Sequence, residues 1–175
     1  MPLVISETKE DEFKTAMSSF ASGVTVITLW DAEDRPYGMT ASAFSSVSMD
    51  PFLVLICLNR STRTYQDVSL RGRFGVNILD RSAVEISQYC ARPGEDKCLR
   101  EEWMMVDQDS GRPPALTGAI AYLDCNLRSE VEAGTHSVLL GEVAAVGLAD
   151  RKGGDPLVYF QGAYRELKMT ELAHA

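Results

Sequence analysis

Seven short segments rich in β-branched and aromatic residues follow one another along this chain, with few helical segments between them. They are residues 24–30, 37–42, 52–58, 73–79, 119–127, 136–146 and 157–164, and residues 45–48 are ambiguous between strand and loop. Parallel strands need long crossover connections, usually helices. Because regular helical crossovers are missing, we predict a mainly β fold with peripheral helices, an antiparallel barrel rather than a doubly wound sheet.

Helical periodicity is confined to a few segments. Residues 7–21 predict a helix with Phe13, Met17 and Phe20 on one apolar face. Residues 61–70 predict a second, shorter helix. A third predicted helix lies before residue 91, and the segment 91–117 that follows it is long, charged and mostly irregular. Connections of this length are uncommon unless they are functional.

A capping signal precedes the third predicted helix. Ser82 and Glu85 have the spacing of a capping box, in which each side chain bonds to the other's backbone amide. The helix behind them presents one face, formed by Ala83, Ile86, Tyr89 and Cys90. A further short helix is expected near residues 98–105.

The acidic balance of the chain excludes several classes of partner. Its 175 residues carry 17 Lys and Arg against 25 Asp and Glu, a net charge of −8. Nucleic-acid binders need Lys and Arg to displace phosphate counterions, and anionic membranes attract basic segments. We expect neither partner. The N-terminus lacks the features of a signal peptide, and the longest apolar run, residues 52–58, is too short to span a bilayer. One cytoplasmic domain, residues 1–175, is therefore predicted.

The sequence lacks the local motifs of several enzyme classes. It contains no Rossmann glycine fingerprint, Walker loop, nucleophile elbow or zincin motif. Four cysteines without Cys-x-x-Cys spacing and only two histidines predict neither a metal site nor a disulfide scaffold. Nothing marks a cysteine as activated, so we interpret all four as structural thiols, although a Cys–His pair assembled by the fold stays open.

Three polar features stand out against this background. Small hydroxyl residues are dense at 38–42 and 45–48, which suits close contact between a flat ligand and the backbone, or an exposed strand edge. His136, on a predicted strand just past a Gly-Thr turn, suits a hydrogen bond to a ligand near neutral pH, or a half-buried structural role.

The third feature is the segment 59–64, where a strand leads directly into a helix. Free backbone amides and the positive end of the helix dipole favour an anion there. Residues 59–81 hold five arginines against two aspartates, a net +3, which leaves −11 for the rest of the chain. A phosphate-bearing ligand would explain this contrast, and so would a helix N-cap with solvated arginines.

Together these features resemble the short-chain flavin reductases, the reductase components of two-component flavin monooxygenases. The resemblance covers a core of about 13–166, and the segments that carry it are 20–28, 38–44, 46–51, 59–62, 74–79, 123–125, 134–136, 141–143 and 156–159. It implies the FMN-binding split-barrel fold and a homodimer with flavin near the subunit interface. It also implies hydride transfer from NADH or NADPH to FMN or FAD, with reduced flavin passing to a separate oxygenase component.

The resemblance also implies a set of cofactor-binding residues. The isoalloxazine edge would contact Thr40, Ala41, Ser42, Ser46, Val47 and Ser48. The ribityl-phosphate would contact Cys57, Asn59, Ser61 and Thr62, with Arg63 as a helper. Phe74 and Asn77 lie on a neighbouring strand, and His136 and Tyr159 would lie where nicotinamide docks. No catalytic acid, base, nucleophile or metal is expected, because the flavin supplies the chemistry.

The chain departs from the family pattern at two positions. Phe52 follows Asp50-Pro51 where many relatives have a second proline, and Thr135 replaces an acidic residue before His136. The second departure leaves the choice between NADH and NADPH open. Three other readings remain: a split-barrel protein that retains its flavin as a sensor or carrier, an oxidase of the pyridoxine-phosphate type, and a non-catalytic binding module.

Overall fold

One curled antiparallel sheet forms the framework of the protein. The computed structural model describes residues 9–94, 97–105, 111–149 and 154–167. Seven strands pair in the order β3-β2-β6-β7-β8-β5-β4, and every neighbouring pair is antiparallel. The strands are β2 (Thr25–Trp30), β3 (Pro36–Ala41), β4 (Phe44–Met49), β5 (Phe52–Asn59), β6 (Arg73–Leu79), β7 (Ala119–Ala133) and β8 (His136–Leu148). The predicted mainly β, antiparallel architecture is confirmed.

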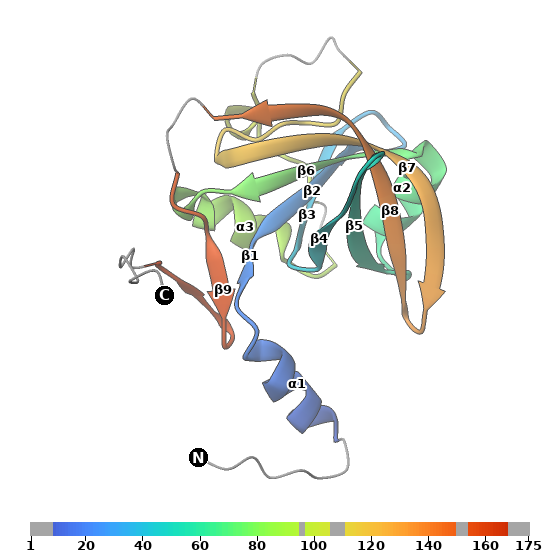
Figure 1. The fold of residues 1–175 in the computed structure, drawn as a ribbon. Coiled ribbons are helices and arrows are strands. Elements are labelled where there is room, and N and C mark those ends of the chain that lie inside the picture. The colour runs from blue at the N-terminus through green and yellow to red at the C-terminus, as the bar shows by residue number, and fades with distance from the viewer. Residues whose placement is uncertain (1–8, 95–96, 106–110, 150–153, 168–175) are drawn as a thin grey trace.

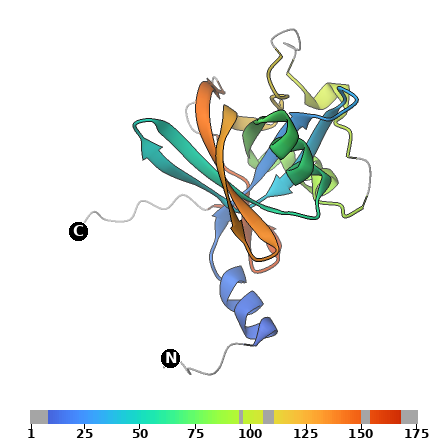
Figure 2. The ribbon, with the colours of Figure 1, turned by 90° about the vertical axis from the view of Figure 1, so that its right-hand side faces the viewer.

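The two edge strands of this sheet, β3 and β4, are consecutive in the chain. Only Ser42 and Ala43 separate them, although they lie at opposite ends of the strand order. The sheet therefore curls round and brings the end of β3 close to the start of β4. The backbone amide of Cys57 on β5 donates to the carbonyl of Ala43 over 3.1 Å, which continues the pairing of β4 with β5. The two edges do not pair with each other, so the barrel is split rather than closed. Figure 2 shows the β4–β5 hairpin extending away from the other strands.

Buried side chains form two cores, because the strands alternate their faces. The first lies inside the curl of the sheet and includes Ile27, Ile56, Phe74 and Leu139. The second lies on the other face of β2 and β6, beneath helix α3 (Val84–Cys90), and includes Val26, Leu79, Leu99 and Trp103. The short 3-10 helices η1 (Arg81–Ala83) and η2 (Glu101–Trp103) border this second core. Helix α2 (Arg63–Arg71) connects β5 to β6.

A second, smaller sheet lies beside the barrel. It has the order β1-β9-β10, with β1 (Ser22–Gly23), β9 (Val158–Phe160) and β10 (Ala163–Arg165). The single strand expected over residues 157–164 is therefore two short strands. Gln161 and Gly162 both have positive φ, 49° and 75°. Two successive left-handed residues form the tight turn that suits a hairpin, which reverses the chain there.

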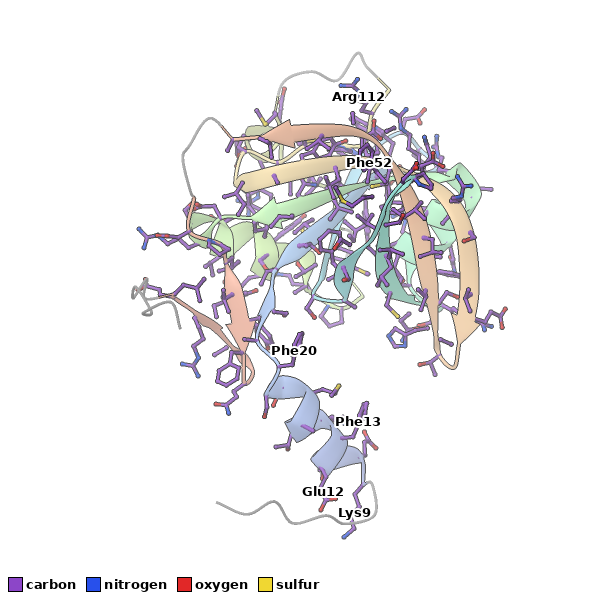
Figure 3. The ribbon with its side chains drawn as sticks, viewed as in Figure 1. Lys9, Glu12, Phe13, Phe20, Phe52 and Arg112 are labelled. Carbon is purple, nitrogen blue, oxygen red and sulfur yellow. The ribbon has the colours of Figure 1, made fainter. Side chains whose placement is uncertain are left out.

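Helix α1 (Glu10–Ser18) stands apart from the barrel (Figures 1 and 2). It is shorter than the expected helix 7–21, whose residues 7 and 8 lie outside the described part of the chain. None of its residues is buried. Phe13 on the helix and Phe20 just after it are 56% and 78% exposed, and Figure 3 shows both on the part of the chain that stands apart from the seven-stranded sheet. Phe13 and Met17 of the predicted apolar face lie on the helix, and both are exposed rather than packed against other described residues.

The capping box predicted at Ser82 is wrong. The Asp80 carboxylate instead accepts a hydrogen bond from the amide of Ser82 over 2.8 Å, so Asp80 caps η1, and α3 begins only at Val84. The predicted buried face of this helix is confirmed, since Ala83, Ile86 and Cys90 are buried. None of the helices that the structure describes combines the length and the apolar character that crossing a membrane would require.

Candidate functional site

A long groove lies where β3, the start of α2, the segment after α3 and the β9–β10 hairpin meet. It consists of two adjoining cavities. The tyrosine cavity, of about 380 Å³, is lined by Val24, Met39, Thr40, Ser42, Thr62, Cys90, Ala91, Arg92, Pro93, Lys97, Tyr159 and Tyr164. The α2 cavity, of about 590 Å³, is lined by Tyr37, Met39, Ser61, Thr62, Arg63, Thr64, Pro93, Gly94 and Lys97. Four lining residues are common to both, so the cavities form one continuous groove.

The α2 cavity is built around the N-terminus of a nine-residue helix. Thr62 is the N-cap, and its Oγ1 accepts a hydrogen bond from the amide of Tyr65 over 3.3 Å. The Asn59 side chain prepares this turn, since its Oδ1 accepts from both the amide and the hydroxyl of Ser61 over 2.9 Å. The amides of the first helical turn have no intrahelical acceptors. This end of the groove therefore favours a negatively charged ligand.

The arginines of residues 59–81 do not provide free positive charge to the groove. The ion pairs are Arg60–Glu132 at 2.7 Å, Arg63–Asp31 at 2.7 Å, Arg71–Asp34 at 3.1 Å, Arg73–Asp124 at 2.6 Å and Arg81–Asp155 at 3.1 Å. All five carboxylates come from outside this stretch. The local net charge of +3 is therefore offset by tertiary contacts, and the electrostatic argument for a phosphate drawn from it is wrong.

Arg63 is held by the turn between β2 and β3. Its guanidinium contacts Asp31 at 2.7 Å, Glu33 at 3.1 Å and Asp67 at 3.4 Å, and it lies 5.1 Å from the centre of the Tyr37 ring. Burial of Asp31 acts to raise the pKa of its carboxyl. Hydrogen bonds from Arg35 and from the Glu33 amide outweigh that effect, so the pKa is lowered. Arg63 thus orients the start of α2 through a buried aspartate.

Lys97 lies where the two cavities join. Its side chain is buried, and its Nζ donates to the carbonyl of Cys90 over 3.0 Å and lies 5.9 Å from the centre of the Tyr37 ring. Among the described residues, no carboxylate lies within ion-pair distance of this ammonium. Burial lowers the pKa of Lys97. Lys97 is therefore a buried cation of the groove without a counter-charge among the described residues, and no sequence pattern had singled it out.

Two tyrosines from the β9–β10 hairpin line the other end of the groove. Tyr159 and Tyr164 meet edge to face with their ring centres 5.5 Å apart. The hydroxyl of Tyr164 is hydrogen-bonded to the Ser87 hydroxyl over 2.8 Å, and Thr40 donates to the Ser87 carbonyl over 2.6 Å. These bonds tie the hairpin and β3 to α3. The tyrosine cavity is mostly apolar with a few polar groups, as a site for a planar ring system would be.

The structure brings six of the predicted cofactor-binding residues together in this groove. They are Thr40, Ser42, Ser61, Thr62, Arg63 and Tyr159. Phe74 and Asn77 lie elsewhere: Phe74 is fully buried inside the curl of the sheet, and Asn77 is fully buried on the other face of β6, against Leu116. Asn77 donates to the Thr28 hydroxyl over 3.1 Å and accepts from the Leu116 amide over 2.8 Å. Ala41 is also buried, on β3 against the first core.

The other predicted residues lie beside the groove or away from it. Asn59 and His136 are paired across β5 and β8, next to the start of α2, and the His136 ring contacts the Thr135 hydroxyl at 2.9 Å. Cys57 lies further along β5 and is half-buried. Val47 is exposed at a bulge in β4. Ser46 and Ser48 line a separate apolar cavity of about 390 Å³ between β4, β5 and β8. The flavin-binding role of all these residues stays a prediction.

Two of the four cysteines, Cys90 and Cys125, have the environment of buried structural thiols. Burial raises the pKa of both Cys90 and Cys125 to about 12, far above the range of a nucleophilic thiolate. Within the described residues, no group of three His, Cys, Asp or Glu side chains is placed to hold a metal ion.

Lys97, Thr64 and Tyr164 are groove residues that sequence reasoning missed. Lys97 belongs to the irregular segment 91–117, whose length was the one signal of function there. Its burial depends on packing against β3 and α3, which no local pattern encodes. In the sequence, Thr64 looks like any other residue of a predicted helix, and Tyr164 is the last residue of a predicted strand.

The model of the Flavin reductase like domain matches residues 17–168. The chain belongs to this flavin reductase family. A probable flavin reductase of Rhizobium meliloti is 37% identical over 153 residues, which cover 86% of this chain and 47% of the relative. The reductase component of a flavin-dependent trigonelline monooxygenase of Acinetobacter baylyi is 33% identical, covering 87% of this chain and 47% of the relative. The chain thus spans about half the length of these two curated relatives.

A solved structure shows the same fold over nearly the whole flavin reductase domain. It is the NADH:FAD oxidoreductase SgcE6 of Streptomyces globisporus C-1027 in complex with NAD and FAD fragments. It matches with a TM-score of 0.84 at 26% identity, covering 95% of this chain and 98% of that chain. The split-barrel fold expected from the sequence is therefore confirmed.

The groove fits a flavin nucleotide on observations of this chain alone. Its tyrosine cavity and α2 cavity, of about 380 and 590 Å³, are of the size of small-molecule sites. The Thr64 hydroxyl in the α2 cavity is buried and has no hydrogen-bond partner. A buried hydroxyl without a partner is uncommon, and a ligand oxygen would satisfy it. The polar end would hold the ribityl-phosphate and the apolar end the isoalloxazine.

Proposed function

We propose that this chain is an NAD(P)H-dependent flavin reductase, which transfers hydride from NADH or NADPH to FMN or FAD and supplies reduced flavin to a partner monooxygenase. The single observation that carries the proposal is the continuous groove from the N-terminus of α2 to the Tyr159–Tyr164 pair. Membership of the flavin reductase family supports it. The relatives named above, one an NADH:FAD oxidoreductase and one a monooxygenase reductase component, support the same class of reaction.

In this proposal the protein binds and orients, and it moves no proton. A bound flavin supplies the hydride acceptor. Ser61 and the N-cap Thr62 hold the phosphate end at the start of α2, where amides and helix dipole stabilise negative charge. Thr40, Ser42 and Met39 of the β3 edge form one wall beside the ring system. Tyr159, 40% exposed, covers the open end of the groove and limits the access of water there.

A homodimer is part of the proposal. Large apolar side chains are exposed on two surfaces: Phe13, Met17 and Phe20 around α1, and Val47, Met49, Phe52 and Val146 around the β4–β8 cavity. Contiguous apolar surface of this kind marks a protein interface more often than a solvent face. A second copy of the chain is the occupant that the family resemblance implies.

A mixing assay tests the reductase activity. Purified protein is mixed with NADH or NADPH and excess free FMN or FAD, and the nicotinamide absorbance is followed. Turnover that saturates with free flavin is the expected result. No turnover with either nucleotide would falsify the reductase proposal.

The same preparation separates the proposed function from its nearest alternatives. A protein that stays yellow after gel filtration, with stoichiometric flavin and no exchange with free flavin, would indicate a bound prosthetic group and a sensor or carrier. Oxidation of pyridoxine phosphate in the absence of nicotinamide nucleotide would indicate the other split-barrel chemistry. An oxygenase encoded by a neighbouring gene can then be added. It should form its own product faster only when reduced flavin is supplied.

A further inference from the structure

Ser87 of helix α3 connects two walls of the tyrosine cavity without lining it. The residue is fully buried, and its hydroxyl is hydrogen-bonded to the Tyr164 hydroxyl over 2.8 Å. Its carbonyl accepts a hydrogen bond from the Thr40 hydroxyl over 2.6 Å. Thr40 on β3 and Tyr164 on β10 both line the cavity. One residue behind the cavity therefore holds a polar side chain from each of two walls that are far apart in the sequence.

The wall formed by β3 is fixed to α3. This strand is an edge of the seven-stranded sheet, where it pairs with β2. Helix α3 lies directly against it, because a Cβ added to Gly38 would lie 2.9 Å from Sγ of Cys90. Interiors packed this closely leave little room for a strand and a helix to shift against each other. Thr40 and Ser87 therefore belong to one rigid frame.

The opposite wall, the β9–β10 hairpin, is attached less directly to this frame. Its main-chain hydrogen bonds reach β1 and the carbonyl of Ser18 at the end of α1, which lie outside the seven-stranded sheet (Figure 1). Tyr159 and Tyr164 are directly opposite each other on β9 and β10, and their rings meet edge to face. Tyr164 also packs against the second core. A bond that holds Tyr164 thus sets the position of Tyr159 as well.

We propose that Ser87 is a positioning residue, which sets the width of the tyrosine cavity by holding Tyr164, and with it Tyr159, at a fixed distance from Thr40. The inference rests on the flavin reductase function proposed above. Hydride transfer requires the reacting atoms to lie about 3–3.5 Å apart, and a misplacement of ~1 Å costs roughly 100-fold in rate. The alignment of two planar ring systems in this cavity therefore depends on a wall that Ser87 holds in place.

Two variants remove the hydrogen bond from either side. Ser87→Ala keeps the carbonyl that Thr40 contacts, and Tyr164→Phe keeps the aromatic ring. We expect each variant to slow the reduction of bound FMN in a single turnover about tenfold, with whichever nicotinamide nucleotide the wild type uses. The Kd for FMN, measured by flavin fluorescence, should change less than about threefold, because the distant start of α2 is untouched. The double variant should be no slower than either single variant, since both changes remove the same bond.

Hydrogen exchange tests the same bond without flavin and without turnover. The backbone amides of residues 158–165 should exchange about fivefold faster in both variants than in the wild type, because local opening of the hairpin becomes easier. The amides of β2 and β6 in the centre of the sheet should exchange as in the wild type. If Ser87→Ala does not fold, Tyr164→Phe decides the question, because it changes a half-buried side chain on a short edge strand.

Tyr89→Phe is the matched control on the same helix. The Tyr89 hydroxyl donates to the Cys98 carbonyl over 2.9 Å, and the residue lines neither cavity of the groove. Its replacement should lower the midpoint of urea unfolding about as much as Tyr164→Phe does, because each removes one hydrogen bond of a tyrosine hydroxyl. It should leave the single-turnover rate and the exchange of the hairpin amides unchanged.

The possible failures are distinguishable. Wild-type single-turnover rates in Ser87→Ala and Tyr164→Phe would make the bond purely structural and overturn the positioning role, while leaving the reductase proposal intact. Equal losses of rate and of FMN affinity would also overturn it, because the bond would then act on flavin binding as a whole. Rate losses that add up in the double variant would show that the two residues act separately. A wild-type protein that reduces flavin with neither NADH nor NADPH would overturn both proposals together.

Discussion

The guanidinium of Arg63 and the buried carboxylate of Asp31 form an ion pair of 2.7 Å between the first turn of α2 and the turn after β2. Arg35 contacts the same carboxylate at 3.0 Å, and Arg71 donates to the backbone carbonyl of Asp31. Asp31 thus contacts Arg63 and Arg71 of α2 and Arg35 of the turn between β2 and β3. The position of the N-terminus of α2, and with it the polar end of the groove, depends on this carboxylate.

Asp31→Asn should destabilise the protein by about 2 kcal/mol near pH 7, because hydrogen bonds to a charged group are worth roughly 1.5–3 kcal/mol. The pKa of Asp31 is lowered from 3.8 in the folded chain. Its contribution is therefore complete above pH 3.8 and is lost as the pH falls through the folded-state pKa. Urea unfolding at a series of pH values measures the difference between the two proteins.

Glu33→Gln is the matched control for Asp31→Asn. Glu33 contacts the same two arginines, Arg35 and Arg63, but is 62% exposed. Its replacement should change the stability by less than about 0.5 kcal/mol. An Asp31→Asn protein as stable as the wild type at pH 7 would show that the pair does not hold the turn.

Asn77→Ala should lower the stability by about 2–3 kcal/mol, since it leaves the buried amide of Leu116 without its acceptor. It should leave the Kd for FMN unchanged, because the Asn77 side chain is buried against Leu116 and lines neither cavity of the groove. Urea unfolding and an FMN titration of the folded variant measure the two effects. Asn126→Ala, at an exposed asparagine on β7, should alter neither. A tenfold weaker affinity for FMN in folded Asn77→Ala would instead indicate that Asn77 contacts the flavin.

Gly141→Ala should cost about 1–3 kcal/mol through overpacking. A Cβ at this position would lie 2.5 Å from the tip of the Phe74 ring and 3.1 Å from Cβ of Cys125. Gly23→Ala is the comparison, because a Cβ there meets nothing within 4 Å. Thermal or urea unfolding of the two variants should separate them clearly. Equal stability of both would mean that Phe74 can move aside.

Ser61→Asp should weaken FMN binding about tenfold or more, because it puts a negative charge beside the proposed phosphate. An acidic residue at a helix N-terminus stabilises the helix, so the loss would not come from unfolding. Gln66→Glu adds the same charge to α2 at an exposed position that does not line the groove. Its effect on the Kd should be much smaller. Equal FMN affinities for the wild type and Ser61→Asp would indicate that the phosphate binds elsewhere in the protein.

Phe52→Glu should convert the proposed homodimer to a monomer, because Phe52 is 58% exposed beside the apolar cavity between β4 and β8. Leu70→Glu introduces the same charge at a more exposed apolar residue on α2 and should leave the mass unchanged. Light scattering during gel filtration measures both. A monomeric wild-type protein would contradict the homodimer, and a dimeric Phe52→Glu protein would place the interface on another surface.

Much of the fold follows from local patterns. The alternation of burial along β5 and β8 reflects side chains that point to opposite faces of a strand, whereas β2 and β6 are buried on both faces and were predicted from their apolar and β-branched residues. The hairpin at Gln161 and Gly162 could not be predicted, because positive φ at a glutamine leaves no compositional signal. Phe13 and Met17 lie on α1 as predicted, whereas Phe20 follows the end of the helix. The exposure of these side chains among the described residues depends on the arrangement of whole elements.

The sequence by itself determined the antiparallel architecture, the strand-to-helix turn at Ser61 and Thr62, and the family to which these motifs point. The tertiary structure decided where the charges lie. Arginines that look like a phosphate site in the sequence are neutralised by carboxylates from distant segments, such as Asp31 and Asp124. A lysine from an acidic stretch becomes the buried cation of the groove. Electrostatic interactions act through space, so net charge along the chain does not report the charge that a ligand meets.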